Sequence, residues 1–409
     1  MEVYKTLVCQ KSLLSPIRRL PVELLTEVFK LVGTGPISFK TDLLEVDFEK
    51  EDAQKQRWAR ERLFGSGFTL TWVCYRWRQH ALALPELWSS FSFGSIGQED
   101  SPVAIAFLKE CIRRSGNRTP LDICIDLDSI RCPAWHDSAQ LGVIAVLAEH
   151  AEGLRNFECC VDRIGALDGL YHILVLQESV KRSITRNTRN TPFTFLPHLE
   201  SLTLVFDFDV KNLRDPSLTS PALKIFSALP RLHTLEMTCL RATDAIDVSS
   251  LKMLKTQYYV GDTVAYLLER CPNLESLTVQ SVLNSPFPDP PTSSPTFSHV
   301  NLINLRVTAI DEDFASNAWK SLRLPKLEHL LVAVNASRAN RYFFPNANRE
   351  DPISDLKKML LRSECTLSTV TFLRINILLA VANWFFDGLK RNPDSKESDF
   401  MIEEGFIKW

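Results

Sequence analysis

Acidic side chains are the first residues of this sequence that could act as catalysts or metal ligands. Pairs of aspartates separated by one residue are Asp126 and Asp128, Asp207 and Asp209, and Asp311 and Asp313. Paired carboxylates can hold a cation such as Ca²⁺. Each pair, however, lies near the end of an expected strand, where solvated acidic residues are common, so the sequence does not favour a cation site.

The histidines and cysteines are not spaced as metal ligands or catalytic groups. The eight histidines are dispersed, and the ten cysteines contain no Cys-x-x-Cys pair. Zinc sites have ligands two to four residues apart, and disulfide frameworks belong to small secreted domains. We therefore predict reduced, buried thiols, no metal site and no cofactor.

Sequence motifs of several enzyme classes are also missing. The chain contains no Gly-x-Ser-x-Gly, no phosphate-binding glycine-rich loop with Lys-Ser or Lys-Thr, and no His-Glu-x-x-His. An enzyme on an α/β sheet is an alternative that no constellation supports. We predict that the protein is not an enzyme.

Composition bounds the kind of partner. The 409 residues are 45% hydrophobic and 23% charged, as in globular proteins, and 47 basic side chains nearly balance 49 acidic ones. Because binding to phosphates needs a basic surface, nucleic acid is not an expected partner. The most apolar run, Ile377–Phe386, is shorter than the ~20 residues of a membrane helix, and the N-terminus does not resemble a signal peptide. We expect a cytoplasmic or nuclear protein that does not contact a membrane.

Two amphipathic helices are expected in the first ninety residues. Pro21 stands where a helix accepts proline, apolar residues follow at helical spacing up to Val32, and Gly33 ends the helix. A second helical stretch is predicted from Phe68 to Ala83. Units this small bury too little surface alone. They need a partner surface, which is either the rest of this chain or another protein.

Three separated blocks in this region resemble the F-box family. They read Leu20-Pro21-x-Glu23-Leu24-Leu25-x-x-Val28-Phe29, Val73-Cys74-x-x-Trp77-Arg78 and Leu84-Pro85-Glu86-Leu87-Trp88. The resemblance implies docking on a Skp-type adaptor, which joins such a protein to a cullin-based ubiquitin ligase. The residues that it implies in docking, or in the helix packing that supports docking, are Leu20, Pro21, Leu24, Leu25, Val28, Phe29, Val73, Cys74 and Trp77.

A charged insertion at residues 33–67 separates the first two blocks by more than is usual in the family. It is expected to be a solvated loop with an exposed helix around Lys50–Leu63. It is either neutral, since long surface loops cost little closure entropy, or an obstacle to docking. The intact flanking blocks favour a neutral insertion.

An irregular repeat is predicted in the rest of the chain. The pattern Leu-x-x-Leu-x-apolar recurs from the anchor residues Leu199, Leu232, Leu274, Leu302 and Leu327, which are 33, 42, 28 and 25 residues apart. Helix-like runs are Val103–Arg114, Leu141–Glu149, Ala222–Leu229, Thr263–Cys271 and Ile353–Arg362. Strands and helices that alternate with periods of roughly 20–50 residues are typical of solenoids. The pattern resembles the loose leucine-rich repeats that often follow an F-box; a doubly wound sheet is the alternative.

Strand residues that alternate with the apolar ones are expected to line the concave face, and either this face or the loops at its rim are expected to hold a protein substrate. These are Thr203, Val205, Glu236, Thr238, Thr278, Gln280, Arg306 and Thr308. No single sign of charge dominates the set. Reversing the charges of Glu236 and Arg306 together is expected to weaken substrate capture.

The predicted fold class is α/β, with a small helical F-box followed by an irregular leucine-rich-repeat solenoid that has parallel strands on its concave face and helices on its convex face. The predicted segments are a tail at 1–14, the F-box at 15–95, the repeat domain at 96–386 with a proline-rich loop at 284–296, and a C-terminal cap or tail at 387–409. The predicted function is that of a substrate-recognition adaptor of a Skp–cullin–F-box ubiquitin ligase. The alternative is a non-catalytic protein-binding scaffold unrelated to ubiquitin transfer.

Overall fold

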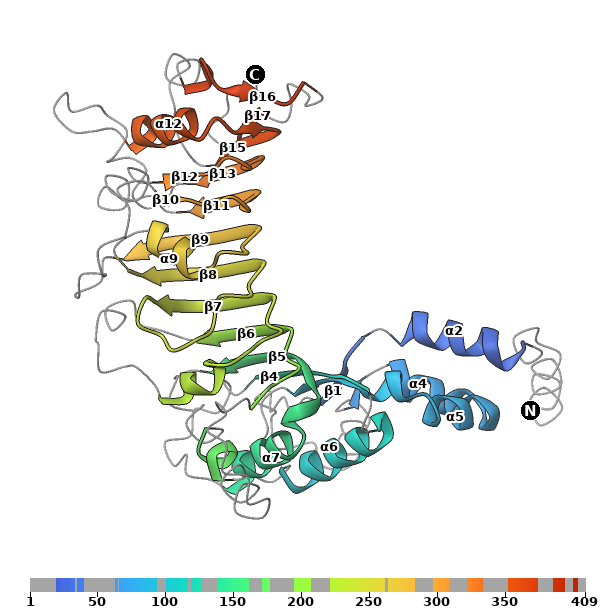
Figure 1. Ribbon diagram of the computed structural model, residues 1–409. Helices are drawn as coiled ribbons and strands as arrows, with labels where there is room; N and C mark the ends of the chain where they lie inside the picture. Colours follow the sequence, from blue (N-terminus) through green and yellow to red (C-terminus); the bar gives the residue numbers. More distant parts are fainter. Residues whose placement is uncertain are drawn as a thin grey trace, which may run out of the picture. The chain divides into compact units, whose positions relative to one another are not determined.

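The chain forms two compact units in the computed structural model of the protein, and Figure 1 shows its helices and strands. The units are Met1–Arg155 and Asn156–Trp409. We call them unit 1 and unit 2. The structure describes residues 20–33, 35–39, 63–64, 66–93, 101–116, 119–126, 138–161, 171–176, 195–206, 221–261, 264–283, 297–308, 322–333, 352–373, 385–393 and 400–403. The predicted domain bounds are drawn from sequence motifs, and this division into two units does not test them.

Unit 1 combines short helices with a small sheet. Its elements are α2 (Val22–Val32), β1 (Ile37–Phe39), β2 (Leu63–Phe64), α4 (Ser66–Val73), α5 (Tyr75–Leu82), the 3₁₀ helix η2 (Pro85–Trp88), β3 (Ser90–Phe93), α6 (Ser101–Ser115), β4 (Leu121–Asp126) and α7 (Ser138–Glu149). The strand order is β4-β3-β1-β2, and only β2 is antiparallel to its neighbour. Figure 1 shows α6 and α7 side by side, and separately α2, α4 and α5 as a group.

The helix α2 is held by one apolar side against α5 and η2. Leu25 and Phe29 are buried, and the rings of Phe29 and Trp77 meet edge to face with centroids 5.0 Å apart. The indole of Trp88 lies in the same core and donates a hydrogen bond to the Ala81 carbonyl at 2.7 Å. Apolar burial and aromatic pairs of this kind fix the positions of short helices that propensity alone would not stabilise.

The single helix predicted from Phe68 to Ala83 is wrong, because the chain forms two helices there. Cys74 lies between α4 and α5 with φ −162° and ψ 171°, which is extended backbone. The Arg78 side chain donates to the Thr71 carbonyl at 2.9 Å and links the two helices across this break. The new direction of α5 turns Trp77 toward Phe29, while Val73 at the end of α4 is exposed.

The charged insertion contains two short strands that the sequence did not predict. β1 pairs in parallel with β3, and β2 pairs with β1 in the antiparallel sense. Both strands fall inside the segment expected to be a loop, so that expectation is wrong at these residues. The helix predicted around Lys50–Leu63 lies almost wholly outside the described residues, as does the proline-rich loop at 284–296.

Unit 2 is dominated by strands. The elements of the main sheet are β5 (Leu154–Val161), β6 (Ser201–Phe206), β7 (Thr234–Arg241), β8 (Met253–Val260), β9 (Ser276–Leu283), β11 (Asn304–Thr308), β13 (His329–Ala333), β15 (Thr369–Leu373) and β17 (Phe400–Glu403). Smaller parallel pairs join β10 (Phe297–Ser298) to β12 (Leu322–Arg323) and β14 (Thr366–Leu367) to β16 (Lys390–Arg391). The helical elements include η8 (Pro221–Phe226), α9 (Val264–Arg270) and α12 (Pro352–Ser363).

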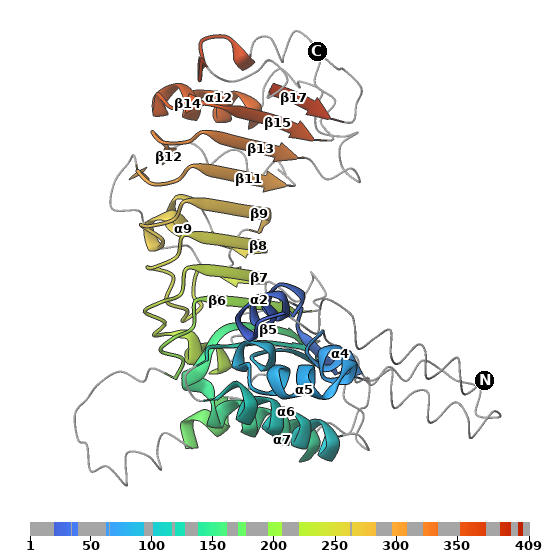
Figure 2. The same ribbon diagram turned by 90° about the vertical axis from the view of Figure 1, so that its right-hand side faces the viewer.

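The strands of the main sheet follow chain order from β5 to β17, and each pairs in parallel with the next (Figure 2). Parallel neighbours need a crossover, which the segments with η8, α9 and α12 provide between successive strands. A mixed α/β structure with a large parallel sheet is therefore present, which confirms the predicted α/β class.

A continuous row of buried side chains runs through this sheet in register. It consists of Phe157, Leu202, Leu235, Leu254, Leu277, Leu305, Leu330 and Val370, each 4% exposed or less. Because strand side chains alternate between faces, one such row on every strand puts the intervening residues on the opposite face. The apolar Leu-x-x-Leu pattern thus determines which residues are available for binding.

The same turn precedes several strands and explains the anchor leucines. The amides of Leu199, Leu232 and Leu274 each bond to the carbonyl three residues earlier, and these leucines are fully buried. Leu251 makes the same bond and precedes β8, a strand absent from the predicted series. The longest predicted spacing, 42 residues, therefore covers two strands.

The predicted helical runs fare differently. α6, α7, α9 and α12 confirm four of them. The run at Ala222–Leu229 is instead the 3₁₀ helix η8. In the part of the chain that the structure describes, no helix is long and apolar enough to span a bilayer.

Candidate functional sites

Exposed apolar side chains lie on the helices α2, α4 and α5 of unit 1. The large ones are between 39% and 77% exposed and are Val22, Leu24, Leu31, Val32, Trp72, Val73 and Tyr75. We call this set the helical apolar face. Leu24 and Leu31 are seven residues apart, so they stand above one another on the same side of α2. Exposed apolar side chains that cluster on a folded chain mark interaction sites.

The start of α2 and the junction of α4 with α5 are held together. Arg76, the second residue of α5, donates from Nη2 to the Leu20 carbonyl at 2.8 Å. This bond brings the exposed Val73 and Tyr75 to the same end of the group as the exposed Leu24. Arg76 thus links the start of α2 to the helix junction where Val73 and Tyr75 are exposed.

The structure divides the residues expected at the adaptor contact into exposed and buried sets. Leu25, Phe29 and Trp77 are 9% exposed or less and form the packing beneath the face. Exposed positions are Pro21, Leu24 and Val73, and half-buried ones are Leu20, Val28 and Cys74. Val22, Leu31, Val32, Trp72 and Tyr75 were not predicted. Helical spacing from Leu24 could have found Leu31, whereas Trp72 and Tyr75 depended on the break at Cys74.

Two rows of partly exposed residues cross the parallel sheet of unit 2. One row is Glu158, Thr203, Glu236, Lys255, Thr278, Arg306, Leu331 and Thr371. The other is Asn156, Ser201, Thr234, Met253, Ser276, Asn304, His329 and Thr369. We call these rows together the polar face. Its residues alternate with the buried row, as expected for a pleated sheet.

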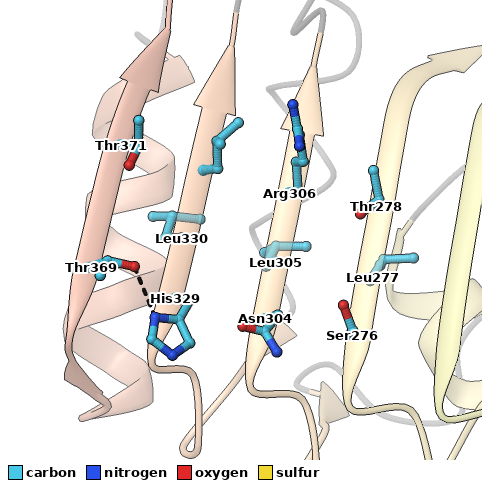
Figure 3. Close-up of a pocket in the computed structure, with 11 residues that line it drawn as sticks. Ser276, Leu277, Thr278, Asn304, Leu305, Arg306, His329, Leu330, Thr369 and Thr371 are labelled. Carbon is cyan, nitrogen blue, oxygen red and sulfur yellow. Dashed lines mark hydrogen bonds between the residues drawn. The ribbon is translucent and has the colours of Figure 1, made fainter. Parts of the chain in front are cut away.

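A hollow of about 320 Å³ lies on the polar face across β9, β11, β13 and β15 (Figure 3). Its polar lining residues are Ser276, Thr278, Asn304, Arg306, His329, Thr369 and Thr371. His329 Nδ1 and Thr369 Oγ1 are 2.8 Å apart and join two of the strands. The described lining of the hollow also includes one permanent cation, Arg306, and four leucines, which are Leu277, Leu305, Leu330 and Leu331.

The residues predicted to face a substrate are distributed along the polar face. Thr203, Glu236, Thr278 and Arg306 belong to one of its rows, and Val205, Thr238 and Gln280 lie farther along their strands. Thr308 pairs with Ala333 at the end of β11. The hollow brings together only Thr278 and Arg306 from this set. Glu236 lies outside it and forms an ion pair with Lys255, a residue on the unpredicted strand β8.

Buried titratable side chains show no activated nucleophile in the described part of the chain. Burial raises the pKa of the Cys111, Cys239 and Cys271 thiols to about 12 and that of Cys365 to about 11. A reactive cysteine needs the opposite shift, because the thiolate is the nucleophile. Within the described ranges, no group of three His, Cys, Asp or Glu side chains could hold a metal ion.

Comparison with known protein families and curated proteins found no relative of this chain. No model of a known protein family matches the chain, and no curated protein matches it. The two surfaces therefore have to be interpreted from their own chemistry.

Proposed function

We propose that the protein is a substrate-recognition adaptor of a Skp–cullin–F-box ubiquitin ligase. The helical apolar face binds a Skp-type adaptor, and through it a cullin, while unit 2 binds a protein substrate. The observation that carries the proposal is the exposure of Leu24, Trp72 and Tyr75 on a group of helices whose packing buries Leu25 and Phe29. Side chains held on packed helices can be covered by a partner at a smaller cost in conformational entropy than those of an unfolded segment.

The finer assignment of the fold is part of the proposal. We take α2, α4 and α5 as the F-box and the main sheet of unit 2 as a leucine-rich-repeat solenoid. Strand order that follows the chain, one turn geometry before several strands and an in-register leucine row support the second assignment. In such an array each unit buries its apolar side against its neighbours.

The mechanism is proximity. Binding a substrate and the ligase to one chain raises the effective concentration of the substrate lysines near the transferring enzyme. The chain's own side chains hold and orient the substrate, and bond formation takes place on other subunits. This role requires two independent binding surfaces, which matches the helical apolar face and the polar face.

The first prediction concerns adaptor binding. Substituting Leu24 and Leu31 by Asp is expected to weaken binding of a recombinant Skp-type adaptor by roughly a hundredfold or more, because two carboxylates would lose water in an apolar contact. Both side chains are more than half exposed, so the fold tolerates the change. Phe29 is fully buried and is unsuitable for this test. Co-purification and calorimetry measure the loss.

The matched control is Leu176→Asp, which introduces the same charge at a leucine of unit 2 that is 66% exposed. It is expected to leave adaptor binding unchanged. Full binding by the Leu24 and Leu31 variant would refute docking through this face. Adaptor binding without cullin recruitment would favour the scaffold function instead.

A further inference from the structure

The hollow on the polar face has the chemistry of a site for an anion. Serine, threonine and asparagine side chains line the hollow with Arg306, and none of the lining residues that the structure describes is acidic. The Arg306 side chain is exposed, and it has no acidic partner among the residues that the structure describes. A guanidinium presents a planar fork of donors that fits a carboxylate in a bidentate manner.

Other cations of the same sheet region are already neutralised. Lys255, two strands away in the same row, forms an ion pair with Glu236. Lys252, just before β8, lies 3.3 Å from Glu275. Arg306 differs from both because its charge is left available in a hollow.

Among the described residues, Glu328 places an acidic group beside one lining residue of the hollow, His329. Glu328 Oε2 is 3.9 Å from His329 Nε2, and the Glu328 side chain is 53% exposed. His329 is also held by Thr369 through its other ring nitrogen. Among the described residues that line the hollow, Arg306 carries the permanent charge.

We propose that this hollow binds an extended acidic segment of the substrate, with a side-chain carboxylate paired to Arg306. The hydroxyl and amide groups of Ser276, Thr278 and Asn304 bond to the segment beside the carboxylate, and an adjacent apolar side chain lies against Leu331. This inference rests on the proposed function, because it gives the substrate site of unit 2 a location and a chemistry.

The size of the hollow limits the length of the recognised segment. It crosses the strands β9, β11, β13 and β15. Adjacent strands are about 4.8 Å apart, so the four span roughly 14 Å, which is the length of about four extended residues. A short acidic motif therefore fills the site.

The test is a direct binding measurement on the full chain. The probe is a fluorescent peptide of alternating glutamate and leucine, compared by anisotropy at low salt with its glutamine and lysine counterparts. We expect the acidic peptide to bind at least about tenfold more tightly than either counterpart, since a charge-assisted pair at a surface is worth about one order of magnitude. Equal binding of the acidic and glutamine peptides would overturn the proposal.

Substitutions distinguish binding at Arg306 from electrostatic attraction by the polar face as a whole. Arg306→Gln is expected to reduce binding of the acidic peptide about tenfold, and Arg306→Lys to restore part of it. The matched control is Lys255→Gln, which removes a cation of the same face that Glu236 already neutralises. Equal losses of peptide affinity in the Arg306 and Lys255 variants would show that the peptide is attracted by the overall positive charge of the face, and would overturn the proposed site. Binding of a phosphoserine peptide without binding of the glutamate peptide would show that the hollow recognises a phosphate, and would overturn the assignment of a carboxylate.

Adaptor binding is measured in parallel so that the two proposals fail separately. If Arg306→Gln leaves peptide binding unchanged while the adaptor complex forms, the acidic-segment site is wrong and the proposed function stands. If the acidic peptide binds as expected but no adaptor complex forms, the site stands and the ubiquitin-ligase function is wrong. Circular dichroism of each variant verifies that the chain is folded.

Discussion

His299 is a buried histidine whose two ring nitrogens both contact the backbone. Its Nε2 lies 2.9 Å from the Cys271 carbonyl, and the Leu302 amide donates to its Nδ1 at 3.2 Å. An amide donor at Nδ1 places the proton on Nε2, which donates to Cys271. His299 occupies the turn position that Leu196, Leu229 or Leu324 occupies before other strands. At this position the imidazole accepts the hydrogen bond of the Leu302 amide, whereas in the other turns a backbone carbonyl accepts it.

Replacing this ring is expected to destabilise unit 2. His299→Ala removes a partner from two buried backbone groups, each of which costs about 1–3 kcal/mol when unsatisfied. The expected loss in free energy of unfolding is about 2–4 kcal/mol, measured by urea denaturation. His198→Ala is the control, because that side chain is exposed. A loss below about 0.5 kcal/mol would contradict the buried two-bond arrangement.

The same histidine makes stability depend on pH. Burial lowers the pKa of His299 from its usual 6.5. The unfolded chain therefore binds a proton more readily than the folded one, so the contribution of His299 is fully present above pH 6.5 and is lost as pH falls below that value. The sequence did not reveal this role, because a single histidine among dispersed ones has no spacing that indicates burial.

At the scale of elements, Gly33 controls how η2 packs on α2. Its amide bonds to the Phe29 carbonyl at 2.7 Å, and its φ of −83° is ordinary for any residue. The requirement for glycine is steric, because a Cβ would lie 2.1 Å from Leu87 Cδ2 and 2.6 Å from the Phe29 oxygen. The helix end predicted at this glycine is correct, but its cause is close packing.

Gly33→Ala is expected to displace Leu87 and to destabilise unit 1 by about 1–3 kcal/mol, as other overpacked sites do. Thermal and urea unfolding measure the change. Gly35→Ala is the matched control, since no atom lies within 4 Å of a Cβ at that position. Equal stabilities of the two variants would show that η2 shifts freely.

Two elements show why sequence periodicity located most strands but not all. The strand β8 includes most of the segment Leu251-Lys-Met-Leu254-Lys-Thr256, in which threonine stands where the other segments have an apolar residue. Thr256 is fully buried all the same, because its hydroxyl donates to the Tyr258 carbonyl at 2.8 Å. The break at Cys74 has no glycine or proline to mark it. Local hydrogen bonds and packing decided both cases, and periodicity does not report them.

At the scale of the whole molecule, the parallel sheet of unit 2 is connected mainly through neighbours. Each strand pairs with the next in the chain, and the buried row passes from Leu235 through Leu254 to Leu277. Where each structural unit contacts only its neighbours, stability is approximately a sum of local terms and nearest-neighbour terms. A defect in one strand should therefore act locally.

Leu254→Ala is expected to cost about 2–5 kcal/mol, because Leu254 is fully buried at the centre of the row. Native-state hydrogen exchange should show the largest loss of protection in β7, β8 and β9, with β13 and β15 less affected. Leu330→Ala in β13 serves as the reciprocal variant and should reverse this order. Uniform loss across all strands in both variants would show one cooperative unit.

Strand spacing has a consequence for any peptide that lies across the polar face. Neighbouring strands offer contact points about 4.8 Å apart, whereas same-side residues of an extended peptide repeat about every 6.7 Å. The two periods agree over three strand gaps and two peptide steps, then drift out of phase. The strand spacing and the peptide spacing therefore match only over a short stretch. Selectivity for a linear ligand would thus be concentrated in a few consecutive residues, and its flanking sequence would be free to vary.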